Sequence, residues 1–160
     1  EVYWSKFNTY FAGDGARIDE EKDICVIGRV DDVLNVAGHR IGTMEIESAL
    51  VDHKAVAEAA VIGIKDDIKG EGIGAFVILK NNQTESAELI NELKRHVANT
   101  ISPIAKPNLV VCTPELPKTR SGKIMRRILR QIVDGDQIGD TTTLASPEII
   151  DVIKGKVDLS

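Results

Sequence analysis

The apolar residues of this chain fall into short runs separated by polar loops, a pattern typical of mixed strands and helices. Three runs rich in β-branched residues predict strands at residues 55–64, 73–80 and 108–112. Two shorter runs, at residues 24–28 and 33–38, predict either a small hairpin or two strands on either side of a hinge. The polar residues 65–72 predict a mobile loop between the first two strands.

Apolar residues spaced three and four positions apart predict four helices. They cover about residues 44–52 with Thr43 as N-cap, a segment from a Ser86 or Thr84 cap to Pro103, about residues 123–133, and a weak helix near 147–154. Their core-facing stripes are Ile46, Ala49 and Leu50, then Ile90, Leu93, Val97 and Ile101, then Ile124, Ile128 and Ile132. The sequence therefore predicts a small α+β domain, with a central sheet of about three strands flanked by helices and a short two-stranded hairpin.

The composition is that of an ordinary globular protein, with 42% hydrophobic residues and a net charge of -5. The chain has no run of about eighteen apolar residues and no secretory pattern at its start. We therefore expect no membrane association and a cytoplasmic location, with the nucleus or an organelle left open. Cys25 and Cys112 lie far apart without metal-ligand spacing, which predicts reduced thiols. The acidic net charge argues against nucleic-acid binding.

Two features of the first residues predict that the chain is part of a longer protein. It begins with Glu1 rather than Met. Five of its six aromatic residues lie in the first eleven positions, and such a cluster needs a partner surface because soluble proteins rarely expose large apolar patches. The alternative is that these aromatic residues cover the core of this domain.

One basic segment stands out against the acidic average. Residues 116–132, "LPKTRSGKIMRRILRQI", carry six cations and no acidic residue: Lys118, Arg120, Lys123, Arg126, Arg127 and Arg130. The predicted helix places Lys123, Arg126 and Arg127 in its first turns, where partial positive charge disfavours cations. This arrangement predicts a phosphate or carboxylate site at the helix N-terminus. A solvated basic face is the alternative.

Two common phosphate and nucleic-acid motifs do not fit this segment. A P-loop requires Ser or Thr after its Lys and a Gly five positions before the second Gly, but Ile124 follows Lys123 and Pro117 precedes Gly122 by five. No aromatic residues interleave with the cations to stack bases. The basic segment by itself therefore indicates an anion but no reaction.

Three segments together resemble a known family. "YFAGDGA" (10–16), "RVDDVLNVAGHRIGTMEIESAL" (29–50) and "PKTRSGKIMRR" (117–127) are similar to the C-terminal part of the acetyl-CoA synthetases, AMP-forming acyl-CoA ligases of the adenylate-forming superfamily. The resemblance implies that residues 1–30 end a large N-terminal domain and approach a hinge at Asp31. Residues 31–160 would then form a mobile C-terminal domain that serves each half-reaction with a different face.

The family reaction defines the ligands that this resemblance implies. ATP, with Mg²⁺, and acetate give an acetyl-adenylate and diphosphate; coenzyme A (CoA) then gives acetyl-CoA and AMP. A propionyl-CoA or other short-chain acyl-CoA ligase is an alternative within the class. A free-standing anion-binding or interaction module is the alternative outside it. Since the phosphate loop and acid pocket of the family are missing from this sequence, we expect the isolated chain to be inactive.

The resemblance also implies roles for individual residues. Lys123 matches the catalytic lysine of adenylation. The same resemblance implies that a protein acetyltransferase acetylates Lys123 and that a sirtuin-type deacetylase restores it. Asp14 and Arg29 match nucleotide-binding residues. The expected CoA-binding turn comprises Ala37, Gly38 and Arg40, of which Arg40 is also expected to meet nucleotide phosphate. We expect His39 to be a satisfied loop histidine.

Two further positions follow from the resemblance. A monovalent or divalent cation site is implied at Val51, His53 and Val56, where carbonyls without helical partners at a helix C-terminus can bind a cation. One His with two apolar residues is a poor metal site on side chains alone. Ala98 stands where close relatives carry an arginine that binds a CoA phosphate. Either Lys94, Arg95 or Lys106 takes that role, or CoA binds more weakly.

Overall fold

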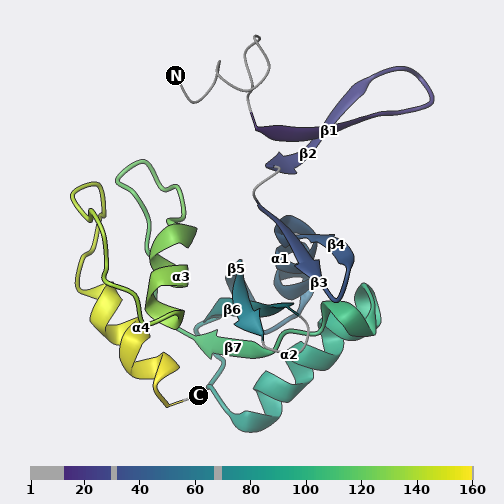
Figure 1. The fold of residues 1–160 in the computed structure, drawn as a ribbon. Coiled ribbons are helices and arrows are strands. Elements are labelled where there is room, and N and C mark those ends of the chain that lie inside the picture. The colour runs from purple at the N-terminus through teal and green to yellow at the C-terminus, as the bar shows by residue number, and fades with distance from the viewer. Residues whose placement is uncertain (1–12, 30–31, 67–69, 160) are drawn as a thin grey trace. The chain divides into compact units, whose positions relative to one another are not determined.

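The computed structural model describes residues 13–29, 32–66 and 70–159 (Figure 1). The chain divides into two compact units, Glu1–Val33 and Leu34–Ser160. In the first unit, β1 (Asp14–Ile18) and β2 (Ile24–Arg29) form an antiparallel pair that runs from Asp14 opposite Arg29 to Ile18 opposite Ile24. Its turn is closed by Asp19, whose carboxylate accepts hydrogen bonds from the amides of Glu21 and Asp23.

The second unit is built on two sheets. Strands β3 (Val33–Val36) and β4 (His39–Gly42) form a small two-stranded sheet. Strands β5 (Val56–Asp66), β6 (Gly70–Leu79) and β7 (Leu109–Cys112) form the central sheet in that order, β5–β6 antiparallel and β6–β7 parallel. The predicted α+β fold with a three-stranded sheet is confirmed.

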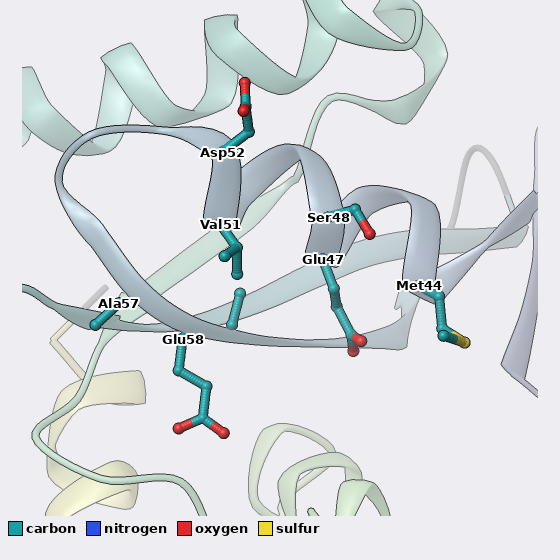
Figure 2. A pocket seen from close by; sticks show the side chains of 8 residues that line it. Met44, Glu47, Ser48, Val51, Asp52, Ala57 and Glu58 are labelled. Atoms are coloured by element: carbon teal, nitrogen blue, oxygen red, sulfur yellow. The ribbon is translucent and has the colours of Figure 1, made fainter.

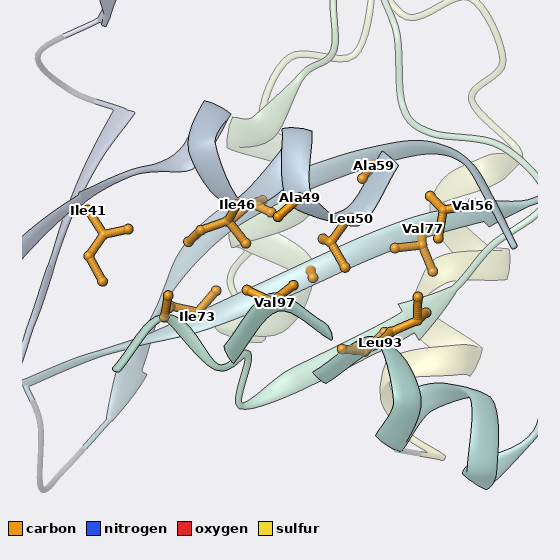
Figure 3. Packing of buried hydrophobic residues seen from close by; sticks show 14 of the residues in the cluster. Ile41, Ile46, Ala49, Leu50, Val56, Ala59, Ile73, Val77, Leu93 and Val97 are labelled. Carbon is orange, nitrogen blue, oxygen red and sulfur yellow. The ribbon is translucent and has the colours of Figure 1, made fainter. Parts of the chain in front are cut away.

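Helices cover both faces of the central sheet because successive strand residues point to opposite sides. Helices α1 (Thr43–Asp52) and α2 (Ala87–Thr100) share one apolar cluster with the sheet, and a short 3₁₀ turn, η2 (Pro103–Ala105), follows α2. Figure 3 shows Leu50 of α1 and Leu93 and Val97 of α2 in this cluster. This first core cluster also includes Val61, Ile73 and Val77 from the sheet, and the buried members of β3 and β4.

Helices α3 (Arg126–Val133) and α4 (Ile149–Val157) build the second core cluster with the other face of the sheet. From the sheet come Ala60, Ile62, Phe76 and Val111; from the helices and loops come Leu116, Ile128, Leu129, Ile132, Leu144, Ile149 and Ile153. Phe76 is fully buried. The sheet is therefore the middle layer of three (Figure 1).

The helix caps agree only in part with the sequence. Ser86 caps α2, as one of the two predicted candidates, and its Oγ accepts a hydrogen bond of 3.2 Å from the Leu89 amide. The Thr43 cap is wrong: Gly42 is the N-cap of α1, and Thr43 lies inside the helix with its buried hydroxyl unpaired among the described residues. The predicted stripes are confirmed in α1, and in α2 Leu93 and Val97 are fully buried.

Three boundaries differ from the prediction. The runs at 24–28 and 33–38 do form strands, but β2 pairs with β1 and β3 pairs with β4, so a hairpin between the two runs is wrong. The predicted loop 65–72 is too long, because β5 extends to Asp66 and β6 begins at Gly70; residues 67–69 lie outside the described residues. Helix α3 begins at Arg126 and not near residue 123. Among the described residues, no helix is long and apolar enough to cross a membrane.

Candidate functional site

Lys123 lies on a short hairpin that precedes α3. Residues Lys118 and Ile124 form a β-bridge, the Thr119 amide donates to the Lys123 carbonyl at 2.9 Å, and the Gly122 amide donates to the Thr119 carbonyl at 2.8 Å. Gly122 has φ +84°, the left-handed conformation that three-residue hairpin loops require of a glycine. The Lys123 amide donates to Thr119 Oγ1 at 3.1 Å, and this hydroxyl lies 2.9 Å from Ser121 Oγ. Hydrogen bonds therefore fix both the amide and the carbonyl of Lys123.

Three of the six cations in the basic segment form hydrogen bonds or ion pairs with other residues of the fold. Lys118 Nζ lies 2.7 Å from Glu58 Oε2. Arg126 Nη2 lies 2.7 Å from one Glu47 carboxylate oxygen and 2.9 Å from the other. Their side chains are mostly buried. These ion pairs tie the basic segment to the sheet and to α1, so these two cations do not form a free anion site.

Arg127 is the third engaged cation. Its Nη2 donates to the Asp140 carbonyl at 2.7 Å and its Nη1 to Gln131 Oε1 at 3.1 Å. The predicted anion site, with three cations in the first helical turns, is therefore wrong in its geometry. Lys123 precedes the helix, and Arg126 and Arg127 make contacts within the fold.

The remaining cations are Arg120, Lys123 and Arg130, whose side chains make no hydrogen bond or ion pair with the described residues. Lys123 is exposed, and so is Arg120 at the same hairpin tip. The Lys123 ammonium has no carboxylate partner in the described part of the chain, and its backbone is ordered. Such a group can bind an anionic ligand with little loss of conformational entropy. Lys123 and Arg120 are therefore the exposed cations of this segment that remain available to bind phosphate or carboxylate.

The predicted CoA-binding turn is the two-residue connection between β3 and β4. Ala37 has φ +49° and Gly38 has φ +83°, so both central residues take the positive φ typical of a tight hairpin turn. Apart from its two chain neighbours, no described residue has an atom within 4 Å of the place where a Gly38 side chain would stand, so this backbone is open to a ligand. His39 Nδ1 lies 3.3 Å from the Ala37 carbonyl oxygen. Arg40 is exposed in β4 beside this turn.

The two expected nucleotide residues of the first unit lie at paired backbone positions on neighbouring strands. Asp14 and Arg29 are direct partners in the β1–β2 register. Gly13, before Asp14, has φ +76°, whereas Gly15 lies within the strand at a register irregularity. Asp14 is exposed. The expected hinge residue Asp31 and the aromatic residues at positions 3–11 lie outside the described residues.

The side chains at the expected cation site do not fit a metal. His53 uses both ring nitrogens, because the Ala55 amide donates to Nδ1 at 3.3 Å and Nε2 lies 3.1 Å from Glu92 Oε1. Hydrogen bonding by His53 is the main cause that holds the pKa of Glu92 below its ordinary value. Val51 is exposed and Val56 is buried. The described residues also contain no group of three or more His, Cys, Asp or Glu that could hold a metal ion.

A shallow groove between α1 and β5 is lined in part by Glu47 and Glu58, the two residues whose pairing with the basic segment the sequence did not reveal. Met44, Glu47, Val51 and Glu58 are among the residues that line it. Figure 2 shows the Glu47 side chain reaching from α1 toward β5, and the Glu58 side chain leaving that strand on the side away from α1. The acidic residues in the first turns of α1 are visible in the sequence. The contacts themselves are not, because Glu47 and Arg126 are 79 positions apart and Glu58 and Lys118 are 60 positions apart.

The neighbours of Ala98 differ in their freedom to replace an arginine. Lys94 Nζ donates to the Asn108 carbonyl at 2.6 Å, and burial, with the nearby charge of Lys106, lowers the pKa of Lys94. Arg95 donates through Nε to the Asn91 carbonyl at 3.3 Å. Arg95 and Lys106 line one open groove together with Glu88 and Asn91. Arg95 and Lys106 are therefore better placed than Lys94 to meet a ligand phosphate.

Comparison with known proteins identifies the family that this chain resembles. Residues 45–123 match the model of the AMP-binding enzyme C-terminal domain. The chain is 54% identical to the Streptomyces coelicolor acetyl-coenzyme A synthetase over 158 residues, which cover 98% of this chain and 24% of that protein. It is 55% identical to the Mycobacterium tuberculosis acetyl-coenzyme A synthetase over 155 residues, or 95% of this chain and 24% of that protein. The chain thus spans about a quarter of the length of these relatives.

Solved structures share the fold. A Brucella canis acyl-CoA synthetase is similar with a TM-score of 0.65 and 41% identity, covering 84% of this chain and 25% of that one. The anthranilate CoA ligase AuaEII in complex with anthranoyl-AMP has a TM-score of 0.71 and 35% identity, covering 82% of this chain and 26% of that one. The chain therefore belongs to the AMP-binding enzyme C-terminal domain family, within which it is similar to the C-terminal part of the acetyl-CoA synthetases.

Proposed function

We propose that this chain is the lysine-bearing C-terminal domain of an AMP-forming acetate–CoA ligase. The complete enzyme converts ATP, acetate and CoA into acetyl-CoA, AMP and diphosphate through an acetyl-adenylate. The main support is the exposed ammonium of Lys123, held on an ordered hairpin, while Lys118, Arg126 and Arg127 of the same segment are engaged in the fold. The more than 50% identity to proteins named acetyl-coenzyme A synthetase supports acetate as the acid.

In the first half-reaction, an acetate oxygen attacks the α-phosphorus of ATP, supplied as its Mg²⁺ complex, and the bond to diphosphate breaks. Lys123 lies between the attacking carboxylate and the α-phosphate and stabilises the charge that develops there. This role requires a positioned positive charge and no proton transfer. Asp14 holds the ribose hydroxyls through its carboxylate, and Arg29 contacts the nucleotide from the opposite strand of the hairpin.

In the second half-reaction, the CoA thiol attacks the acyl carbon and AMP leaves. The domain formed by residues 31–160 rotates about Asp31 relative to residues 1–30 and the large domain that precedes them. This rotation brings the β3–β4 turn at Ala37 and Gly38 to the active site. Pantetheine passes the open backbone of Gly38, and contact at Ala37 is through its backbone. Arg40 meets phosphate. Hinges of this kind need only a few residues that absorb the backbone change.

Acid selectivity belongs to a pocket outside this chain, so a propionyl-CoA or other short-chain acyl-CoA ligase is the alternative within the same chemistry. Comparing kcat/KM for acetate, propionate and butyrate with the complete enzyme decides between them. We expect acetate to give the highest value. A preference for propionate or butyrate would assign the chain to the alternative.

Lys123 is also the proposed point of control. Acetylation by a protein acetyltransferase removes the charge that adenylation needs, and a sirtuin-type deacetylase restores it. The exposure of Lys123 at a hairpin tip supports access by such enzymes. Mass spectrometry of the complete enzyme from cells should find acetyl-Lys123 under some growth conditions; its absence under every condition would contradict this control.

The half-reactions test the proposed function when Lys123→Ala is made in the complete enzyme. We expect acetate-dependent pyrophosphate exchange to be lost, while thioester formation from supplied acetyl-adenylate is retained. If both half-reactions survive, Lys123 has no catalytic role. The isolated chain should form no thioester from ATP, acetate and CoA, because it contributes only one of the two domains that the reaction needs.

A further inference from the structure

The segment after α3 returns to the Lys123 hairpin and pairs with it. Thr119 forms a β-bridge with Leu144. The Arg120 amide donates to the Thr143 carbonyl at 3.3 Å, and the Ala145 amide donates to the Lys118 carbonyl at 2.9 Å. Residues 140–145, here called the strap, therefore add a third backbone segment beside the two arms of the hairpin.

The strap is fixed at both of its ends. Leu144 is buried, with 3% of its surface exposed, in the second core cluster with α3, α4 and the sheet. At the other end, the Asp140 carbonyl accepts the hydrogen bond from Arg127, and the Asp140 carboxylate accepts one of 2.9 Å from the Thr142 amide. That amide is also the main cause that lowers the pKa of Asp140. The strap is thus joined to α3 by a hydrogen bond, to the core by Leu144, and to the hairpin by its backbone.

The hairpin needs this support. Its own arms are joined by few hydrogen bonds, and an isolated two-stranded hairpin is marginally stable in water. A catalytic charge must be held closely, because a displacement of about 1 Å can cost about a hundredfold in rate. Leu144 is the apolar side chain through which the strap enters the core next to Thr119.

We propose that the strap is a positioning element for the catalytic charge, with Leu144 as the positioning residue that sets the hairpin and hence Lys123 for adenylation. This inference rests on the proposed function of Lys123. It assigns a role in the reaction to the polar segment between α3 and α4, which carries no catalytic group of its own. The strap supports the adenylation half-reaction and has no part in thioester formation.

The test compares Leu144→Ala with Ile132→Ala in the complete enzyme. Leu and Ile lose the same number of carbon atoms, and both side chains are buried in the second core cluster, but Ile132 lies near the end of α3 that is farther along the chain from the hairpin. We expect Leu144→Ala to lower acetate-dependent pyrophosphate exchange by about tenfold to a hundredfold. Thioester formation from supplied acetyl-adenylate should stay within about twofold, and Ile132→Ala should leave both within about threefold.

Two more variants keep the outcome decisive. Leu144→Met conserves volume and should restore exchange. Ala145→Pro removes the amide that donates to Lys118 while Leu144 is kept; it should lower exchange selectively, and it decides the test if Leu144→Ala does not fold. Equal loss in both half-reactions, an equal effect of Ile132→Ala, or full exchange in Ala145→Pro would overturn the strap's role. A parallel Lys123→Ala separates the two proposals: full exchange in that variant refutes the proposed function itself.

Discussion

Replacing Glu47 with Ala should destabilise the second unit strongly, because this carboxylate joins elements from both faces of the sheet. Glu47 of α1 accepts three hydrogen bonds from Arg126 of α3, at 2.7, 2.9 and 3.2 Å. It also accepts one of 2.8 Å from the amide of Val61, which belongs to the edge strand β5. The contact therefore satisfies an edge amide and links the two helical layers around that edge.

The magnitude follows from burial. The side chains of Glu47 and Arg126 are 14% and 21% exposed. Breaking a fully buried ion pair by removing one partner costs about 3–5 kcal/mol, and an orphaned buried amide costs about 1–3 kcal/mol. Since the pair retains some solvent and these two costs overlap, we expect Glu47→Ala to lower the free energy of unfolding by about 3 kcal/mol.

Urea denaturation of the chain, followed by the helical signal in circular dichroism, measures this effect. Glu47→Gln keeps an acceptor for the Val61 amide and should lose about half as much. Lys65→Ala is the control, because Lys65 is 78% exposed and its 3.5 Å ion pair with Asp134 should contribute less than about 1 kcal/mol. A loss below about 1 kcal/mol for Glu47→Ala would refute the role assigned to this contact.

Three further predictions concern single residues. Gly122→Ala forces a left-handed conformation on Ala at φ +84° and should lower the free energy of unfolding, measured by urea denaturation, by about 1 kcal/mol. In the complete enzyme, pyrophosphate exchange should fall by a larger proportion than stability does. Unchanged exchange would contradict the need for this turn. Burial raises the pKa of the Cys112 thiol to about 11, so iodoacetamide at neutral pH should modify Cys112 only after unfolding, as peptide mass spectrometry would detect; rapid modification of the native chain would contradict its burial. The lowered pKa of Glu92 stabilises the fold above the pKa of the unfolded state, and this stabilisation is lost as pH falls through the folded pKa, so Glu92→Gln should show a smaller fall in Tm between neutral pH and pH below about 4. An unchanged pH dependence of Tm would rule out that linkage.

Elements with local signals could be predicted from the sequence. The apolar spacing of α2 and its Ser86 cap are complete within the segment that they describe. The strands near residues 55–64 and 108–112 were predictable because runs of mostly apolar residues mark strands whose two faces are largely buried. The sheet between two helical layers follows once those runs and stripes are known.

The start of α3 could not be read from periodicity. Ile124, Ile128 and Ile132 keep helical spacing, yet the Lys123 carbonyl accepts a hydrogen bond of 2.9 Å from the Thr119 amide. In a helix that began at residue 123, this carbonyl would accept from the Arg127 amide instead. The hairpin bond replaces the helical one, so the helix begins at Arg126 and Lys123 stays on the hairpin. Spacing alone does not show which partner a backbone amide chooses.

The roles of the cations depend on residues far away in the sequence. The partners of Lys118 and Arg126 are 60 and 79 positions distant, and no local pattern marks Glu58 or Glu47 as their acceptors. A run of six positive charges therefore looks uniform in the sequence, although the fold uses some for structure and leaves Lys123 at an exposed tip. The separation of these roles is what tertiary structure adds.

The central claim is that the charge of Lys123 itself, and not the general charge of its surroundings, serves adenylation. The most direct measurement is acetate-dependent pyrophosphate exchange by the complete enzyme carrying Lys123→Gln or, as a matched control, Arg120→Gln, since each variant removes one positive charge from the same hairpin tip. We predict a loss of about a hundredfold or more for Lys123→Gln and a change within about threefold for Arg120→Gln. Equal losses in the two variants would contradict the claim.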